Sequence, residues 1–281
     1  MDILLPIIIM AALGFLFSLG LAFAYQKLKV EENPKVVEVS ENLPQANCGA
    51  CGYSGCRAFA EAVVEGEASA NGCPVGGSET AQRIAEILGM EAGEMIKKVA
   101  RLHCRGDHAA AKARGDYLGL TTCYAANLVG GNKQCSYGCM GYGDCVRVCQ
   151  FDALYMGDNG LPYVVEENCT ACGKCVDACP RNLFELHALD QNILVFCRSL
   201  DRGPASKKAC KNACIGCGIC ARACPDAIEI KENLAVILDY KKIDSDQIPA
   251  MEKCPTDAIG RLRREDVGAP EGAPLEAVHE G

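Results

Sequence analysis

The hydrophobic pattern of the chain begins with one long apolar run at the amino end. Between Ile3 and Ala24 the only polar side chain is Ser18. A helix rises about 1.5 Å per residue and needs roughly 20 apolar residues to cross a bilayer. A cleaved signal peptide, the alternative interpretation, would carry basic residues before the run, and none stands there. The pattern therefore predicts a transmembrane helix over 1–26.

The charges beside this run predict its orientation. Lys27, Lys29 and Lys35 follow the apolar residues, and no basic side chain precedes them. Basic residues accumulate on the cytoplasmic side of membrane helices. We therefore expect a single-pass protein of the cell inner (cytoplasmic) membrane, with the bulk of the chain on the cytoplasmic side.

The next segments change from a linker pattern to a helical one. Residues 27–46 hold two prolines, several charges and no sustained apolar period, which predicts a linker. Over residues 56–66 apolar side chains recur three and four positions apart, and a second such stretch starts at Ser78, a candidate N-cap. After glycine interruptions the helical pattern resumes over 95–102. We expect residues 47–102 to form a mainly helical unit.

Beyond residue 130 the pattern changes to short β-prone segments around cysteine-rich turns. Turn signals at Asp158-Asn159-Gly160 and at Glu232-Asn233 each join two such segments. Each predicted hairpin follows a run of cysteines. The paired segments are 153–156 with 163–165, and 228–230 with 235–238.

Composition adds one dominant feature, because 21 of the 281 residues are cysteine. A chain of this length with an odd cysteine number fits a small secreted disulfide scaffold poorly, so we expect reduced thiols that bind metal. The formal net charge of −8 argues against a nucleic-acid partner. The sequence has neither a Walker-type phosphate loop nor a GxGxxG turn, so we expect this chain to bind no flavin or NAD. Paired carboxylates for acid–base work are not apparent, and no stand-alone catalytic site is predicted.

Two cysteine runs have the ferredoxin spacing C-x2-C-x2-C-x3-C-P. Three sulfurs of such a run converge from one tight loop on a [4Fe–4S] cluster, and the fourth reaches a second cluster. Zinc sites usually pair two short knuckles across a longer gap, so iron–sulfur clusters explain these runs better than zinc. The runs are Cys169, Cys172, Cys175 and Cys179, and Cys214, Cys217, Cys220 and Cys224.

A stretched version of the run precedes the first of them, at Cys135, Cys139, Cys145 and Cys149. Exchange of the fourth ligands, as in two-cluster ferredoxins, predicts two [4Fe–4S] clusters in this module. The predicted ligand sets are Cys135, Cys139, Cys145 and Cys179, and Cys149, Cys169, Cys172 and Cys175.

The second module is degenerate. A complete module would carry three more cysteines before Cys254, but the sequence there is KKIDSDQIPAMEKC. One cluster is therefore expected, and Cys224, which has lost its companions, is predicted to be an unliganded, buried thiol. The ligand set of the remaining cluster is Cys214, Cys217, Cys220 and Cys254.

Eight cysteines lie outside these runs. Four near the amino end are set among glycines and predict a further cluster, with zinc as the competing metal. The other four are far apart in sequence and are either buried apolar thiols or the ligands of a fifth cluster. The histidines show no ligand spacing, and we expect His103 to pack or to lie at the surface. The two sets are Cys48, Cys51, Cys56 and Cys73, and Cys104, Cys123, Cys197 and Cys210.

These patterns predict an α+β chain with an N-terminal transmembrane helix, a small mainly helical [4Fe–4S] domain and two tandem ferredoxin-like modules. The predicted segments are a transmembrane helix (1–26), a linker (27–46), a helical [4Fe–4S] domain (47–102), a connecting segment (103–129), a two-cluster ferredoxin-like module (130–195), a degenerate ferredoxin-like module (196–262) and a disordered tail (263–281).

The segment LPQANCGACGYSGCRAFAEAVVEGEASANGCPVGG (43–77), with the apolar span and the tandem runs, resembles the B subunit of the Rnf complex, the ion-translocating ferredoxin:NAD⁺ oxidoreductase of bacterial membranes. Residues 104–145 are similar to the longer form found in anaerobes. The resemblance implies a protein that accepts electrons from soluble ferredoxin and relays them to flavin- and NAD-binding and integral membrane partner subunits, coupled to Na⁺ or H⁺ transport. The missing cysteines before Cys254 depart from the fuller pattern of that form.

An acidic ferredoxin would need a basic surface to dock, and candidate residues lie around the last module. An ordinary solvated loop explains the same residues equally well. Two other functions stay open: an electron-transfer subunit of another membrane oxidoreductase, and an iron–sulfur sensor or assembly scaffold. Sensors usually carry one labile cluster and a signalling or DNA-binding domain, unlike this sequence. The candidate docking residues are Arg198, Arg202, Lys207, Lys208 and Lys211.

Overall fold

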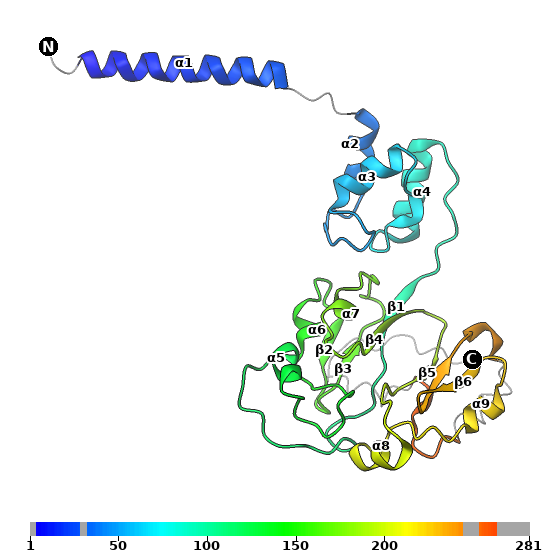
Figure 1. Cartoon of the computed structure of the whole chain (residues 1–281). Coiled ribbons are helices and arrows are strands. Elements are labelled where there is room, and N and C mark those ends of the chain that lie inside the picture. The colour runs from blue at the N-terminus through cyan, green and yellow to red at the C-terminus, as the bar shows by residue number, and fades with distance from the viewer. Residues whose placement is uncertain (1–3, 29–32, 244–252, 263–281) are drawn as a thin grey trace.

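The computed structural model describes residues 4–28, 33–243 and 253–262. The predicted apolar helix is confirmed as α1 (Leu4–Leu28), which lies apart from the rest of the chain in Figure 1. None of the side chains of Leu5–Leu28 is buried, and by length and composition this helix can cross a membrane. The predicted disordered tail over 263–281 lies outside the described residues.

A small helical unit follows α1. Its helices pack around Val39, Phe59 and Ile84, which are almost completely buried. The prediction of a helix over 56–66 is confirmed, and the helix predicted from Ser78 begins one residue earlier, at a glycine N-cap without a side-chain hydrogen bond. The elements of this unit are α2 (Pro34–Glu41), α3 (Cys56–Val64), the 3-10 turn η1 (Ala70–Gly72) and α4 (Gly77–Leu88).

The predicted linker over 27–46 is wrong over residues 34–41, because these form α2, which belongs to the helical unit. Asn33 caps this helix by accepting a hydrogen bond from the Lys35 N–H at 3.0 Å. Pro34 occupies the first helical turn, where its missing N–H is not needed, so it starts the helix rather than breaking it. Val36 and Val39, three residues apart, are buried against α3 and α4.

The helix predicted over 95–102 is also wrong. Residues Lys98–Leu102 form strand β1, which pairs antiparallel with β4 (Phe184–Ala188). Val99 and Ala100 are buried in this pairing. A partner strand far along the chain supplies the backbone hydrogen bonds and the packing, and these override the local helical pattern.

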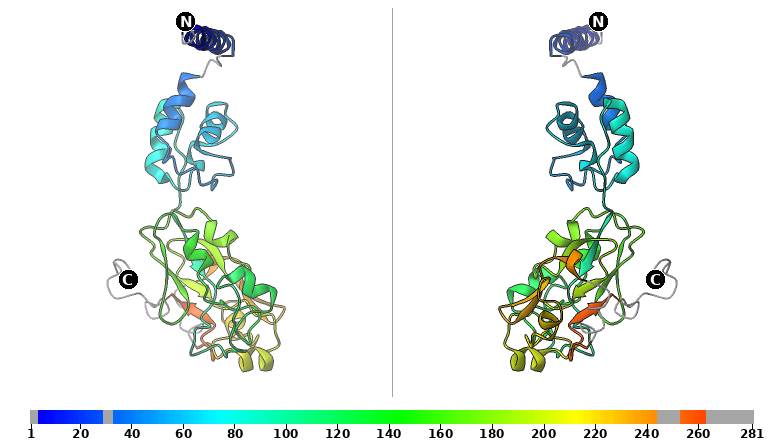
Figure 2. Two further views of the ribbon diagram at one scale, coloured as in Figure 1. Left: turned by 90° about the vertical axis from the view of Figure 1, so that its left-hand side faces the viewer. Right: turned by 90° about the vertical axis from the view of Figure 1, so that its right-hand side faces the viewer.

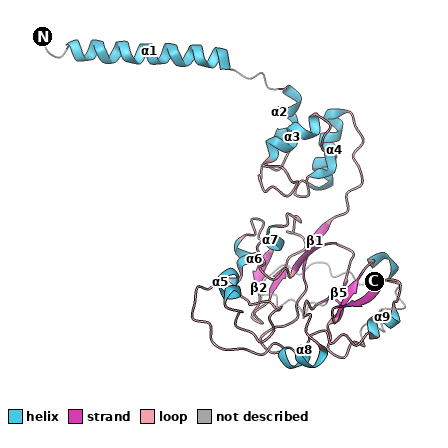
Figure 3. Ribbon diagram, in the orientation of Figure 1, coloured by secondary structure: helices cyan, strands magenta, loops and turns pink. Residues whose placement is uncertain are grey.

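The larger unit, residues 98–262, is built from short elements joined by loops (Figure 3). Among the described residues its strands form antiparallel pairs: β1 with β4, β2 (Leu154–Met156) with β3 (Pro162–Val164), β5 (Ile193–Val195) with β8 (Ile259–Arg261), and β6 (Ile228–Lys231) with β7 (Leu234–Ile237). Its helical elements are α5 (Cys123–Leu128), α6 (Asp144–Arg147), α7 (Lys174–Asp177), α8 (Gly203–Ala209), α9 (Ile219–Ala223) and the 3-10 turn η2 (Tyr240–Lys242). Both predicted hairpins, β2–β3 and β6–β7, are confirmed.

Sheet β5–β8 connects the two halves of this unit. It pairs residues 193–195 with residues 259–261, so the carboxyl end of the described chain returns beside the connection between the two modules. Arg105 fixes this return, because its guanidinium donates to the Asp257 and Arg261 carbonyls at 3.0 and 2.7 Å and lies over the Phe196 ring. The two turned views of Figure 2 show the helical unit and the larger unit as separate bodies along one axis.

Candidate metal centres

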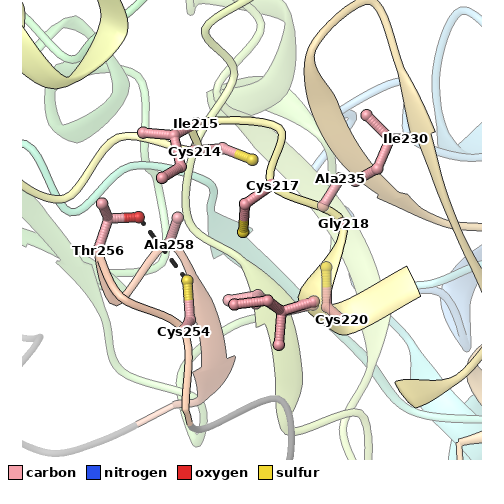
Figure 4. A pocket seen from close by; sticks show the side chains of 12 residues that line it. Cys214, Ile215, Cys217, Gly218, Cys220, Ile230, Ala235, Cys254, Thr256 and Ala258 are labelled. Atoms are coloured by element: carbon pink, nitrogen blue, oxygen red, sulfur yellow. Dashed lines mark hydrogen bonds between the residues drawn. The ribbon is translucent and has the colours of Figure 1, made fainter. Parts of the chain in front are cut away.

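One cavity of the larger unit is lined by the four cysteines predicted to act together in the degenerate module. They are Cys214, Cys217, Cys220 and Cys254. Their side chains surround a common space in Figure 4. Gly216 turns this loop with a φ of +65°, and a side chain there would meet the Asn233 carbonyl at 3.0 Å. Cys217 is exposed, so this group of thiols reaches the surface.

The second predicted ferredoxin set is also brought together. The thiols of Cys149, Cys169 and Cys172 all interact electrostatically with Cys175. The pKa of Cys175 is raised to about 12. Burial is the largest cause, and the neighbouring sulfurs add to it. The Ala100 N–H on β1 donates to Cys169 Sγ at 3.4 Å, so the strand that leads from the helical unit touches this group.

A third group forms between α5, α6 and the Cys179-Pro180 turn. Asp144 Oδ2, at the start of α6, accepts the Tyr124 N–H at 3.0 Å, and Thr122 caps α5. These contacts hold the first residue of α5 beside α6. The four cysteines of this group line a second cavity, and they are Cys123, Cys139, Cys145 and Cys179.

A fourth group collects cysteines from segments far apart in sequence. Gly106 lies between two of them, since a Cβ there would be 3.4 Å from both Cys104 Sγ and Cys210 Sγ. Backbone N–H groups of Gly106 and Ser199 donate to Cys104 and Cys197 sulfurs at 3.4 Å. The unfilled space at this cavity, part of it open to solvent, is about as large as that of the degenerate module, about 340 against 370 Å³. It is lined by Cys104, Cys135, Cys197 and Cys210.

The third and fourth groups differ from the predicted sets by one exchange, in which Cys123 and Cys135 change places. Arg181 explains the position of Cys135, because its Nη1 donates to the Cys135 and Gly138 carbonyls at 3.1 and 2.6 Å. Residues 132–134 also pair with residues 112–114, which draws this loop toward Cys104. One sequence signal indicates this difference. The spacing of the stretched run is irregular, as expected if Cys135 does not share a cluster with the cysteines that follow it in the run.

In the helical unit, one hydrophobic core, that of Val39 and Phe59, contains or contacts Cys51, Cys56 and Cys73. Cys73 interacts electrostatically with the other two, and Gly76 N–H donates to its sulfur at 3.3 Å. Cys48 follows Asn47, whose side-chain oxygen accepts the Cys56 N–H at 2.9 Å. The structure therefore brings three cysteines of the predicted amino-end set together and holds the fourth on a loop tied to them.

The chemistry of these groups fits iron–sulfur clusters. Burial raises the pKa of the Cys139, Cys175 and Cys197 thiols to about 12, so they do not ionise unless bound metal compensates the charge. Four sulfurs around one cavity, with backbone N–H groups directed at sulfur, are the donors that a [4Fe–4S] cluster needs. Cys224 is 1% exposed and lines none of these three described cavities, and its sulfur lies 3.6 Å from the Lys242 carbonyl oxygen. The predicted burial of Cys224 is confirmed.

The four groups of the larger unit adjoin one another in a series. Cys145 of the third group interacts electrostatically with Cys175 of the second. Cys139 of the third interacts with Cys104 of the fourth, and the fourth adjoins the degenerate module through Cys197 and Cys214. The group that sequence spacing left undecided thus lies between the two modules.

The candidate docking residues fall into two kinds. Arg198 pairs with Glu185 and is half-buried. The other four are exposed, on or beside α8. This helix adjoins the degenerate-module group, because its Ser206 hydroxyl donates to the Cys214 carbonyl at 2.8 Å. The four exposed residues are Arg202, Lys207, Lys208 and Lys211.

Three protein-family models match parts of the chain. They are described as a putative Fe–S cluster (residues 43–75), a 4Fe–4S binding domain (162–185) and a 4Fe–4S single cluster domain of ferredoxin I (210–261). The last description agrees with one cluster in the degenerate module.

Curated relatives match nearly the whole chain. The B subunit of the Na⁺-translocating ferredoxin:NAD⁺ oxidoreductase complex of Acetobacterium woodii is 45% identical over 92% of this chain and 77% of its own length. The B subunit of the ion-translocating oxidoreductase complex of Methanosarcina acetivorans is 40% identical over 88% of this chain and 92% of its own. The B subunit of the proton-translocating ferredoxin:NAD⁺ oxidoreductase complex of Clostridium ljungdahlii is 40% identical over 92% of both chains.

Proposed function

Because this chain belongs to the family formed by the B subunits of Rnf-type ion-translocating ferredoxin:NAD⁺ oxidoreductase complexes, we propose that it takes electrons from reduced ferredoxin and relays them to partner subunits. The series of four adjoining cysteine groups carries this proposal. The partners are flavin- and NAD-binding and integral membrane subunits, and the complex couples the reaction to Na⁺ or H⁺ transport.

Five sets of cysteines hold the [4Fe–4S] clusters, which when bound supply one-electron transfer. The protein contributes sulfur ligands, backbone N–H donors to sulfur and burial, the features that tune such centres. The four sets of the larger unit are the four groups described above, with Cys123 and Cys135 exchanged relative to the spacing-based sets. The fifth set is Cys48, Cys51, Cys56 and Cys73 of the helical unit.

Helix α1 anchors the protein in the cytoplasmic membrane, with the cysteine-bearing units on the cytoplasmic side. The three lysines just after the apolar residues support this orientation. Ferredoxin is a soluble cytoplasmic donor, so this side is where the two proteins can meet.

We place ferredoxin docking at α8. Exposed Lys207 and Lys208 lie there, and the adjoining cysteine group reaches the surface at Cys217. A basic surface beside an accessible redox centre suits an acidic, one-electron donor. Reversal of both charges, Lys207→Glu with Lys208→Glu, should raise the apparent KM for ferredoxin about tenfold at low salt and much less at high salt. The matched control reverses exposed Lys97 and Lys98, and an equal effect of the two double variants would exclude docking at α8.

Iron content tests the ligand sets. Loss of any ligand should remove one cluster, about four irons from about 20 per chain. Two losses within one set remove a single cluster, so Cys104→Ala with Cys135→Ala should cost about four irons, and Cys104→Ala with Cys123→Ala about eight. A loss of about eight irons in the first double variant and about four in the second would instead support the spacing-based sets. About 16 irons in the unsubstituted chain would contradict a cluster in the fourth group.

The function itself is tested in membranes. Deletion of the gene should abolish ferredoxin-dependent NAD⁺ reduction in washed membranes, and the unaltered gene supplied in trans should restore it. Undiminished activity in the deletion strain would overturn the proposal.

A further inference from the structure

Outside the cysteine groups, three side chains direct ligand atoms at one point. His103 follows β1, while Glu185 and His187 lie two residues apart on one face of β4. The two imidazole Nε2 atoms are 2.9 Å apart, and Glu185 Oε2 is 3.4 Å from the first and 3.5 Å from the second. Both histidines are buried, at 4% and 6% exposure.

The outer nitrogens of both rings face oxygen acceptors. His103 Nδ1 lies 2.8 Å from the Val195 carbonyl oxygen on β5, and His187 Nδ1 lies 3.3 Å from Gln191 Oε1. Gln191 Oε1 also accepts the Ala188 N–H at 3.2 Å, which identifies it as the oxygen of the amide. Both Nδ1 atoms therefore donate, and in the neutral rings both Nε2 atoms present lone pairs.

Two imidazole lone pairs and a carboxylate oxygen thus converge with no donor among them. Such an arrangement is unfavourable in a buried site unless a cation lies between the atoms. Metal-binding histidines usually donate a hydrogen bond to a carbonyl oxygen from the nitrogen that does not bind the metal, and this bond orients the ring.

The spacing selects the kind of cation. The three distances form a triangle whose circumscribed circle has a radius of about 1.9 Å, and three nitrogen or oxygen ligands at 2.0–2.1 Å from a tetrahedral zinc ion lie on a circle of about that size. Octahedral ligands at the same bond length subtend smaller angles and lie on a smaller circle. The other oxygen of Glu185, Oε1, is paired with Arg198, so Oε2 alone is directed at the histidines.

We propose that His103, Glu185 and His187 bind one zinc ion, separate from the iron–sulfur ligands. Glu185 is 47% exposed and gives the ion a route from solvent. The Tyr240 ring packs against the His187 ring in a T-shaped contact, with the ring centroids 5.2 Å apart. Because the ligands come from the end of β1 and from β4, and His103 is held by β5, the ion would join these strands next to the segment that carries Cys104.

Zinc content and coordination test the site. The full chain is purified anaerobically in detergent with its clusters intact, supplied with ZnCl₂ and passed over a chelating resin. We expect about one zinc per chain, with zinc–nitrogen or zinc–oxygen distances near 2.0 Å and no zinc–sulfur distance near 2.3 Å by X-ray absorption. The sulfur distance separates this site from zinc held by cysteines that have lost their cluster.

The variants His187→Asn and Glu185→Gln should each weaken zinc binding at least tenfold, while iron content stays at the level of the unsubstituted chain. His108→Asn is the matched control, because this exposed histidine lies outside the site. Glu185→Gln removes only a charge at a partly exposed position, so it keeps the test valid if His187→Asn fails to fold. Failure of the unsubstituted chain to retain zinc, retention unchanged by Glu185→Gln, or a zinc–sulfur distance would overturn the proposal.

Discussion

One side chain, Arg181, makes several of the hydrogen bonds that hold the loop that carries Cys135. Its guanidinium donates to three backbone carbonyls, those of Cys135, Gly138 and Gly130, at 3.1, 2.6 and 3.0 Å, and to Asn127 Oδ1 at 3.0 Å. Arg181→Met keeps the volume of the side chain and removes every one of these donors. The carbonyls would then have to find other donors or water, and the loop that directs Cys135 away from the run around it would lose its main restraint.

The expected cost follows from these contacts. A hydrogen bond in a partly exposed network contributes about 1 kcal/mol, so loss of the network should cost about 3–4 kcal/mol. For a unit of 150–250 residues, 1 kcal/mol shifts the Tm by about 2–4 °C. Arg181→Met should therefore lower the apparent Tm by about 6–16 °C at a fixed scan rate. Because Cys135 also loses its position, iron content should fall by about four per chain.

Thermal unfolding followed at the visible iron–sulfur absorbance measures both effects in one sample. Arg147→Met is the control: this exposed arginine contacts the Tyr142 carbonyl and Asp144 at the surface, where such contacts contribute about 0–1 kcal/mol. Arg181→Lys, which keeps the charge but not the planar set of donors, should fall between the two. Equal Tm values and equal iron content for Arg181→Met and Arg147→Met would refute the role given to this network.

Three further changes test other parts of the fold. Gly106→Val places a branched side chain between two sulfurs of the fourth group and should remove about four irons, whereas Gly115→Val, which meets nothing within 4 Å, should remove none. Cys224→Ala should leave iron content unchanged, and a loss of about four irons would make Cys224 a ligand. Val39→Ala should destabilise the helical unit by about 2 kcal/mol in denaturant unfolding followed by circular dichroism. Val37→Ala, on the exposed side of α2, should cost less than about 0.5 kcal/mol, and a similar cost for both would place α2 outside the core.

Local patterns predicted the parts of the fold that form from neighbouring residues. The apolar run became α1, and the turn signals near Asn159 and Asn233 became the hairpins β2–β3 and β6–β7. The sequence did not predict helix α2, because its few apolar residues stand among prolines and charges. Their role in the core becomes visible only when they pack against α3 and α4. Strand β1 was missed because its partner, β4, lies more than 80 residues away.

The same distinction applies to the candidate metal centres. Spacing by itself grouped Cys169, Cys172 and Cys175, because three cysteines in one short loop must lie close to one another. It assigned Cys135 to the set that the structure completes with Cys123, because spacing does not show the contacts, such as those of Asp144 and Arg181, that position these two cysteines among distant segments. The convergence of His103 with His187 was equally invisible, since these residues meet only when β1 pairs with β4. The sequence alone determined the chemistry of the donors and the short-range sets, and tertiary packing decided which distant donors share a cavity.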